Sequence, residues 1–269
     1  MATISIIMGA YNISNRIEKV KKSVLSIRQQ TFTDWEFIIC DDGSEDNTYE
    51  LLMDISKEDP RIKIIGYKTN CGLAHALNYC LKYSTGRYIA RQDDDDTSAI
   101  TRLEKEIFFL DHYKEFAFVG TMAKVVSNES VLGDYKVPEN PISKDFLWNS
   151  PFIHPTVMFR KEALTSVNGY RESRETRRCE DYDLFMRMYK DKLYGYNIQE
   201  PLYFYYVDIK AKSKHRPMKY RIDEFVVRYK RFSEIGLGME RYLYMIKPLV
   251  MGIIPNLFIN LLNGRKYRG

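Results

Sequence analysis

The sequence contains little cysteine, glycine or proline, and each shortage excludes a class of protein. Its four cysteines, among 269 residues, include no Cys-x-x-Cys pair, which argues against a zinc knuckle and against a disulfide scaffold. We therefore expect reduced thiols, as in the cytoplasm. Fourteen glycines and nine prolines are too few for a low-complexity chain, and 45% hydrophobic with 29% charged residues is typical of a folded domain.

Long uncharged runs are also missing. The longest, residues 248–264, has 17 residues and contains two prolines and three asparagines. Even as a continuous helix it would extend only about 25 Å, which is short of the ~30 Å hydrocarbon core of a membrane. Residues 3–9 are apolar but lack the basic start and the cleavage site of a secretory signal, so we expect neither a span nor a leader.

The charge is unevenly distributed along the chain. The net charge is +5, but residues 208–269 carry 14 Lys and Arg against 5 Asp and Glu, whereas residues 1–207 carry 27 against 31. A nucleic-acid-binding fold would have a basic face on its body, so we expect no nucleic-acid partner. An acidic body suits cation binding, and a basic tail suits contact with an anionic surface.

Strand-like and helix-like segments alternate through the first half. Short β-branched runs are typical of buried strands, and apolar residues three or four positions apart are typical of amphipathic helices. The predicted strands are 4–8, 37–40, 62–65, 88–90 and 116–119, and the predicted helices are 16–30, 74–83, 103–113 and one capped by Asp46 or Asn47. This order indicates βαβ units, and hence an α/β protein with a mainly parallel central sheet and flanking helices.

The alternation weakens beyond about residue 125. Residues 126–149 are polar and turn-rich, residues 154–159 are predicted to form a strand, and residues 180–189 are predicted to form a helix. With no second core and no repeat in evidence, we predict one domain over residues 1–207, with halves that meet near residue 125. A basic, apolar and helical extension over residues 208–269 is predicted to follow it.

Three polar clusters follow predicted strands at their carboxyl ends: Ala10-Tyr11-Asn12, Asp41-Asp42 and Asp93–Asp96. Parallel sheets bind ligands at this edge. The four aspartates cannot all ionise cheaply there without a cation, and oxygen ligands suit Mg²⁺ or Mn²⁺. Alternation places Asp93 and Asp95 on one side of an extended segment. A solvated acidic loop is the alternative, which the apolar strand before the run disfavours.

The other candidate residues each have a structural alternative. Asp41-Asp42 is equally well explained as a turn, and the Tyr11 ring can stack on a base or pack within its loop. Glu180-Asp181 opens a helix, where acids also favour the helix dipole. His154 is a candidate general base or metal ligand, although a lone histidine at a strand start is more often structural.

Several motifs, taken together, occur in the order of a known family. They are Ser5-Ile6-Ile7-Met8-Gly9-Ala10-Tyr11-Asn12, Gln30-Thr31-Phe32, Asp41-Asp42-Gly43-Ser44, Asn70-Cys71-Gly72-Leu73-Ala74, Ala76-Leu77-Asn78, Ala90-Arg91-Gln92-Asp93-Asp94-Asp95-Asp96 and Glu180-Asp181-Tyr182-Asp183-Leu184. Over about residues 3–206 the chain resembles the family 2 inverting glycosyltransferases of the GT-A fold, of the type that builds bacterial capsular or cell-surface polysaccharide. Each motif alone is weak, and their common order is specific.

The resemblance implies a role for each matching residue. Tyr11 would stack near the nucleotide base, Asp42 would hydrogen-bond it, and Asp93 would contact the ribose or the metal. Asp95, the last acid of the DxD motif, would bind Mg²⁺ or Mn²⁺ on the diphosphate, and Asp181 would be the catalytic base. Further nucleotide-binding candidates are Ala10, Asn12, Asn70 and Asp94, and the acceptor-side candidates are His154 and Glu180.

Two residues depart from the family pattern. Asp94 stands where a small or apolar residue is usual, so the metal ligands can shift by one position along the run. Gln92 stands where an apolar residue is frequent, and we attach no functional consequence to it.

The chemistry of glycosyl transfer matches these parts. The departing diphosphate needs its charge neutralised, which a metal held by Asp95 supplies. The acceptor hydroxyl needs a carboxylate to take its proton, a role for Asp181, and single displacement inverts the anomeric configuration. Two alternatives stay open. A nucleotidyltransferase would need a glycine-rich basic loop after the first strand, and a non-catalytic sugar-binding protein would not need both Asp95 and Asp181.

The resemblance also implies the partners. The donor is expected to be a nucleotide-diphosphate sugar, with UDP favoured and TDP second, and the acceptor a glycan or lipid-linked oligosaccharide bound by residues 126–207. The apolar segment 242–262 has basic neighbours, which predicts an interfacial membrane anchor; a helix packed on the domain or on a second subunit is the alternative. We expect a cytoplasmic protein, peripheral on the inner face of the cytoplasmic membrane, with a homodimer as a further partner.

Overall fold

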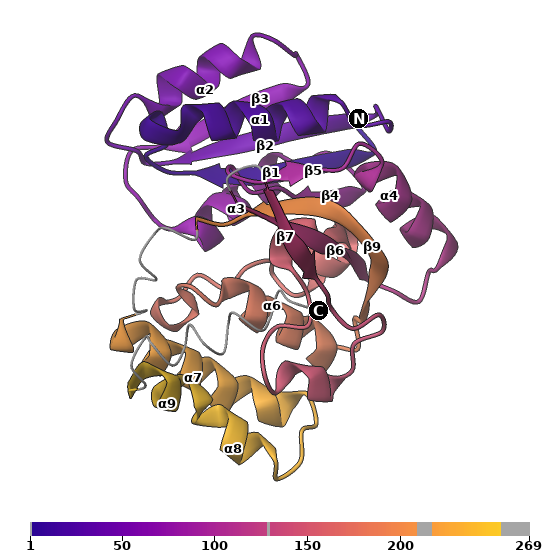
Figure 1. Ribbon diagram of the computed structural model, residues 1–269, viewed down its shortest axis with the longest axis vertical. Helices are drawn as coiled ribbons and strands as arrows, with labels where there is room; N and C mark the ends of the chain where they lie inside the picture. Colours follow the sequence, from indigo (N-terminus) through magenta and orange to yellow (C-terminus); the bar gives the residue numbers. More distant parts are fainter. Residues whose placement is uncertain (1, 128–129, 209–216, 254–269) are drawn as a thin grey trace.

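The computed structural model describes residues 2–127, 130–208 and 217–253, and these form an α/β structure with a central sheet covered by helices (Figure 1). The strands of the sheet are β1 Ile4–Ala10, β2 Trp35–Asp42, β3 Ile62–Tyr67, β4 Tyr88–Arg91, β5 Thr97–Ser98, β6 Phe118–Ser127, β7 Ser130–Tyr135, β8 Met158–Arg160 and β9 Gly195–Tyr206. The helices are α1 Ile17–Arg28, α2 Thr48–Ser56, α3 Leu73–Tyr83, α4 Arg102–His112, α5 Lys161–Ser166, α6 Glu180–Lys190, α7 Met218–Glu234, α8 Arg241–Met245 and α9 Lys247–Ile253. Single 3₁₀ turns are η1 Ser14–Arg16, η2 Ser143–Phe146, η3 His154–Thr156 and η4 Arg174–Thr176.

The sheet is parallel in its first half and mixed in its second. Strand β1 lies between β2 and β4, and β3 pairs with β2, all in parallel. Strand β8 is antiparallel to β4 and β6, whereas β9 runs parallel to β6 and then pairs antiparallel with β5. Two register shifts between β6 and β9 bend the long β9 strand, which curls across the sheet in Figure 1. The predicted parallel sheet is therefore confirmed for its first half.

Two hydrophobic cores lie on opposite faces of the sheet because side chains alternate along a strand. In β1, Ile6 packs with Val20 and Val24 of α1, and the next residue, Ile7, packs on the other face with Leu77 of α3. In β2, the same alternation sends Ile39 and Cys40 to opposite cores. The mostly apolar strands of the first half are buried on both faces, as the β-branched runs predict.

Helix α7 belongs to the body of the molecule although it follows the predicted boundary at residue 207. Its Val227 and Phe232 are fully buried in the same core as Phe185 of α6. The buried Arg228 donates hydrogen bonds to the carbonyl oxygens of Leu147 and Trp148, at 2.7 and 3.1 Å. The first part of the predicted extension is thus a packed helix, while residues 254–269 lie outside the described residues.

Three predictions about residues 116–159 are wrong in detail. Residues 154–159 do not form one strand, because Pro155 has no N–H for a strand ladder and the chain makes the 3₁₀ turn η3 before β8 begins. The strand predicted at 116–119 begins at Phe118 and continues to Ser127. The stretch read as turns contains β7, which pairs with β6, and β9 was not predicted.

Candidate active site

A cavity of about 770 Å³ opens at the carboxyl ends of β1, β2 and β4, which is the predicted edge of the sheet. Its walls come from these strand ends, from the start of α3, and from residues 172–180 before and at the start of α6. The predicted site residues that line it are Ala10, Tyr11, Asp42, Asn70, Asp93, Asp94, Asp95 and Glu180. Asn12, His154 and Asp181 are not among the lining residues. The structure therefore brings together most of the residues that the motifs single out.

The loop after β1 presents an aromatic ring to the cavity. The side chain of Tyr11 is 39% exposed, which leaves a ring face open. The next residue, Asn12, has a positive φ of 48° and bridges to the loop after β2: its side-chain oxygen accepts from Glu45 N, and its N–H donates to Ser44 Oγ, both at 3.0 Å. Asn12 thus links the loop after β1 to the loop after β2, although it does not itself line the cavity.

Asp42 is buried and organises the segment that leads into α3. One carboxylate oxygen accepts hydrogen bonds from Tyr67 Oη at 2.6 Å and Cys71 N at 2.9 Å, and the other accepts from Asn70 Nδ2 and Gly72 N, both at 2.9 Å. These donors use the acceptor capacity of a carboxylate almost completely. Asp42 therefore fixes Asn70 and the start of α3 at the cavity wall.

The four aspartates after β4 have different surroundings. Asp94 is buried and pairs with Arg16 at 2.5 Å, and Asp96 is buried and accepts a hydrogen bond from Tyr206 N at 2.8 Å. Asp93 and Asp95 are half-buried on the cavity wall, and Asp94 and Asp95 lie in a turn rather than in the extended segment that the predicted alternation assumes. Burial raises the pKa of Asp95, and the neighbouring Asp93 charge raises it further. A cation between these two carboxylates would relieve that cost.

Beneath the aspartates lies Arg91, a residue that the sequence patterns missed. Its side chain is 1% exposed, and its guanidinium forms an ion pair with Asp93. The Asp93 charge keeps the pKa of Arg91 above its usual value in spite of burial, so the guanidinium stays charged. Arg91 was missed because a single arginine at the end of an apolar strand has no pattern that marks it as buried.

Gln92 has a structural function that explains its departure from the apolar residue usual at this position. Its amide nitrogen donates to Ser23 Oγ and to the carbonyl oxygen of Asp96, both at 3.0 Å, and its amide oxygen accepts from Ser98 Oγ at 2.8 Å and from Arg102 at 3.1 Å. An apolar side chain could make none of these bonds. The buried Gln92 side chain therefore holds the turn over residues 93–96 by hydrogen bonds.

The carboxylates suit a divalent cation only as part of a shared site. Among the described residues no group of three or more His, Cys, Asp or Glu is arranged to hold a metal ion. Asp93 and Asp95 supply two hard oxygen ligands, and Mg²⁺ is commonly bound by one or two carboxylates together with substrate phosphates. The residues present therefore fit a cation that binds with a diphosphate.

Helix α6 begins at the cavity with two acids. Glu180 lines the cavity, and burial together with the Asp181 carboxylate raises its pKa to about 7. The N-terminus of α6 faces the same region, and its dipole favours negative charge there. Near neutral pH, Glu180 therefore holds a proton for part of the time.

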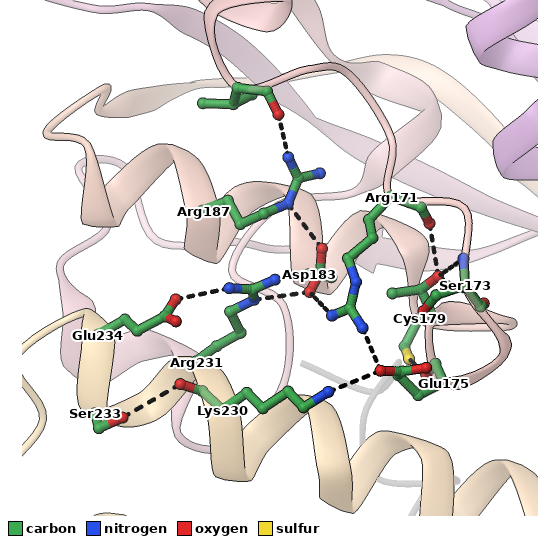
Figure 2. A network of polar contacts seen from close by, with 12 residues as sticks. Arg171, Ser173, Glu175, Cys179, Asp183, Arg187, Lys230, Arg231, Ser233 and Glu234 are labelled. Atoms are coloured by element: carbon green, nitrogen blue, oxygen red, sulfur yellow. Dashed lines mark hydrogen bonds and ion pairs between the residues drawn. The ribbon is translucent and has the colours of Figure 1, made fainter.

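The first turn of α6 is fixed by the buried carboxylate of Asp183 (Figure 2). Asp183 is fully buried and pairs with Arg187 and with Arg231 of α7, both at 2.8 Å, while Arg171 lies at 3.4 Å. The contact with α7 crosses the predicted boundary at residue 207. A helix of the predicted extension therefore helps to hold the helix that carries Glu180 and Asp181.

His154 lies outside the cavity and is buried. Its Nε2 forms a hydrogen bond with the hydroxyl group of Tyr170 at 2.8 Å. Burial and the Arg91 charge lower the pKa of His154 well below its usual value. The geometry favours the structural alternative for His154.

Helix α7 also supplies a cavity residue that was not predicted. Tyr220 in its first turn lines the cavity, and the Lys219 ammonium lies 4.8 Å from the centre of that ring. No motif signals this residue because it lies far along the chain from the others and reaches the cavity only through the packing of α7.

Comparisons with known proteins identify the family of the chain. The family described as "Glycosyl transferase family 2" matches residues 5–168. The chain is 38% identical over 258 residues to the putative glycosyltransferase EpsE of Bacillus subtilis (strain 168), which covers 96% of this chain and 91% of that protein. It is 28% identical over 274 residues to the Escherichia coli enzyme WfgD, a "UDP-Glc:alpha-D-GlcNAc-diphosphoundecaprenol beta-1,3-glucosyltransferase", with 98% of each chain covered.

Among solved structures, the mannosyltransferase PcManGT of Pyrobaculum calidifontis, in complex with GDP-Man and Mn²⁺, superposes with a TM-score of 0.67. The identity is 15%, and the match covers 93% of this chain and 73% of that one. This likeness confirms the predicted GT-A fold. The family match and the 38% identity to EpsE show that the chain belongs to glycosyl transferase family 2 and is a glycosyltransferase.

Proposed function

We propose that the protein transfers a sugar from a nucleotide-diphosphate sugar, with UDP favoured, to a hydroxyl group of a glycan or lipid-linked acceptor, with inversion at the anomeric carbon. The observation that carries this proposal is that one cavity contains the Tyr11 ring, the Asp93 and Asp95 carboxylates and the start of α6. The donor needs an aromatic face for its base and acids for its metal. WfgD uses UDP-Glc according to its name, which supports UDP as the nucleotide.

In this proposal, residues 10–12 and 67–72 bind the nucleotide. The exposed ring of Tyr11 stacks on the base, and Ala10 and Asn70 frame it. The carboxylate of Asp42 already accepts several protein hydrogen bonds, so its part is to hold Asn70 in place, and a bond to the base would replace one of them. Asn12 acts through the loop contacts described above.

Asp93 and Asp95 would hold Mg²⁺ or Mn²⁺ with the diphosphate oxygens. When bound, the cation neutralises the charge that develops on the departing diphosphate. Asp94 and Asp96 are committed to Arg16 and to Tyr206 N, which supports ligands at positions 93 and 95 rather than one residue later. The Mn²⁺ in the PcManGT complex shows a divalent cation on this fold.

Asp181 is the proposed general base. A base must be ionised before it accepts a proton, and the raised pKa of Glu180 keeps that residue partly protonated near neutral pH. Asp181 takes the proton of the acceptor hydroxyl as the oxygen attacks the anomeric carbon. The bond between that carbon and the diphosphate oxygen breaks on the opposite face, and the configuration inverts.

The test compares the two neighbouring acids as matched isosteric variants. Asp181→Asn is expected to lower turnover by about 10²–10⁴-fold with donor affinity near normal, whereas Glu180→Gln lowers it far less. Turnover with a UDP-sugar and Mn²⁺, and UDP affinity by calorimetry, give the two readouts. Equal losses in both variants, or unchanged turnover in Asp181→Asn, would place the base elsewhere, with His154 the next candidate to substitute.

We further propose that the protein works at the inner face of the cytoplasmic membrane, on a lipid-linked acceptor. No described helix is long and apolar enough to cross a membrane. Around α8 and α9, Met239, Leu243 and Ile253 are 77%, 73% and 77% exposed, and Lys247 lies on the same segment. Exposed apolar side chains beside a basic residue are typical of an interfacial contact. The homodimer stays a prediction.

A further inference from the structure

Two arginines on the cavity wall have no counter-ion among the described residues. Arg174 and Arg177 line the cavity in the short segment between β8 and α6, and both side chains are exposed. Within residues 2–127, 130–208 and 217–253, neither guanidinium has a hydrogen-bond or ion-pair partner. An arginine that faces a cavity without an acid to pair with is available to an anionic ligand.

The nearby acids are already committed to other cations. Glu172 pairs with His75 at 2.7 Å and accepts a hydrogen bond from Asn78. Glu175 pairs with Lys230 at 2.8 Å and with Arg171, as Figure 2 shows. Asp183 is surrounded by its three arginines. The remaining acids between residues 171 and 183 are Glu180, which burial keeps partly protonated, and Asp181, which is the proposed general base.

The segment is also held in a fixed backbone conformation. The hydroxyl group of Thr176 donates to the carbonyl oxygens of Arg171 at 2.6 Å and of Ser173 at 3.0 Å, which closes the η4 turn around Arg174. Thr176 is 1% exposed, so these bonds are shielded from water. Arg174 and Arg177 therefore project from a backbone segment that is held by buried hydrogen bonds.

We propose that Arg174 and Arg177 bind a phosphate or diphosphate group of a substrate. Guanidinium groups match phosphate oxygens in charge and in the geometry of their paired N–H donors. Two sources of that group are compatible with the site: the donor diphosphate and a phosphate on the acceptor. This inference rests on the proposed function, because it assigns these two residues to the substrates of that same cavity.

The test uses the full chain with the double substitution Arg174→Gln and Arg177→Gln. One arm measures UDP affinity with Mn²⁺ by calorimetry. The other arm saturates the protein with UDP and Mn²⁺ and measures flotation with phosphatidylcholine vesicles that contain a polyprenyl diphosphate, against vesicles with the uncharged polyprenol. Arg87→Gln is the matched control, since Arg87 is an exposed arginine at the start of β4, away from the cavity.

We expect the double variant to lose at least about tenfold in affinity, either for UDP or for the polyprenyl diphosphate vesicles. The double variant Arg174→Lys and Arg177→Lys should retain part of the lost affinity, because it keeps the positive charges. A loss confined to the vesicles assigns the site to the acceptor, and a loss of UDP affinity assigns it to the donor. The inference is overturned if the variant matches wild type in both arms. Failure of the proposed function itself looks different, because wild type would then bind no UDP at all.

Discussion

At the scale of single residues, burial separates aspartates that are neighbours in sequence. Asp94 and Asp96 are buried and bonded to Arg16 and to Tyr206 N, whereas Asp93 and Asp95 are half-buried, with the positive charge of Arg91 beneath Asp93. In the function proposed above, this run therefore contains two structural positions and two metal ligands. The difference arises within a turn, since residues 92–96 form no strand in the structure and their side chains do not simply alternate.

This division predicts that Asp95→Asn loses most transfer activity and most of the metal dependence of UDP binding, with the thermal midpoint little changed. Asp94→Asn is the matched variant, and it should lose much less activity because its carboxylate serves Arg16. Excess chelator should abolish transfer by wild type. Full transfer in chelator, or an Asp94→Asn loss as large as that of Asp95→Asn, would contradict the assignment of the ligands.

A second prediction at this scale concerns His154 and pH. The pKa of His154 lies well below 6.5 in the folded chain, so the unfolded chain binds a proton first as the pH falls below 6.5. This residue should therefore lower the unfolding free energy as the pH falls from 7 to 5. Urea unfolding of wild type and His154→Gln checks it: the variant should show the smaller loss on acidification, and parallel pH profiles would show that the histidine is not buried neutral.

At the scale of elements, α6 and α7 act as a pair. Asp183 on α6 is fully buried between Arg187 of its own helix and Arg231 of α7, with Arg171 of the cavity segment close by (Figure 2). The carboxylate joins the helix with the proposed base, the wall of the cavity and the C-terminal helix. Movement of α7 would therefore be transmitted to the start of α6.

This contact predicts a large effect of a small substitution. Asp183→Asn keeps the side-chain shape but leaves three partly buried arginines without their carboxylate, which should lower the unfolding free energy by about 3 kcal/mol. Glu234→Gln removes a more exposed partner of the same Arg231 and should cost about 1 kcal/mol or less. Urea unfolding measures both. Similar small losses in the two variants would mean that the buried pairing contributes little.

At the scale of the whole molecule, the C-terminal part divides into a packed helix and an exposed apolar end. Arg228 of α7 also donates to the carbonyl oxygen of Tyr244, at 3.2 Å, so α8 lies against α7. The outer residues Leu243 and Ile253 remain exposed. Both accounts of the extension therefore have support, since the inner part packs on the domain and the outer part is available to a surface.

Removal of residues 240–269 is expected to leave a folded, donor-hydrolysing enzyme that binds anionic liposomes more weakly. Because the truncation also uncovers part of α7, the variant with Leu243→Ser and Ile253→Ser gives a milder test of the same surface. Flotation at low salt measures binding, and hydrolysis of a UDP-sugar serves as the folding control. Equal flotation of full-length and truncated protein, or none by either, would end the membrane proposal.

Much of the site could be predicted from the chain because its residues lie directly after strands. An apolar run such as Ile4–Met8 forms a buried strand of the sheet. The residues that directly follow such a strand lie at the carboxyl edge of a parallel sheet, where ligands bind. Tyr11 and Asp95 are positioned in this way. The signal is local, so the strands of the first half and their polar ends could be inferred without any knowledge of distant contacts, whereas the order of the strands in the sheet was not predicted.

The sequence by itself thus determined the parallel half of the sheet, the GT-A resemblance and the acids at its edge. Only the tertiary structure decided that Arg91 is buried beneath Asp93, that Tyr220 of α7 reaches the cavity, and that Arg174 and Arg177 are left without partners among the described residues. These features depend on contacts between segments far apart in the chain. Periodicity describes which face of an element is apolar, but only packing decides which charges find partners and which remain for a ligand.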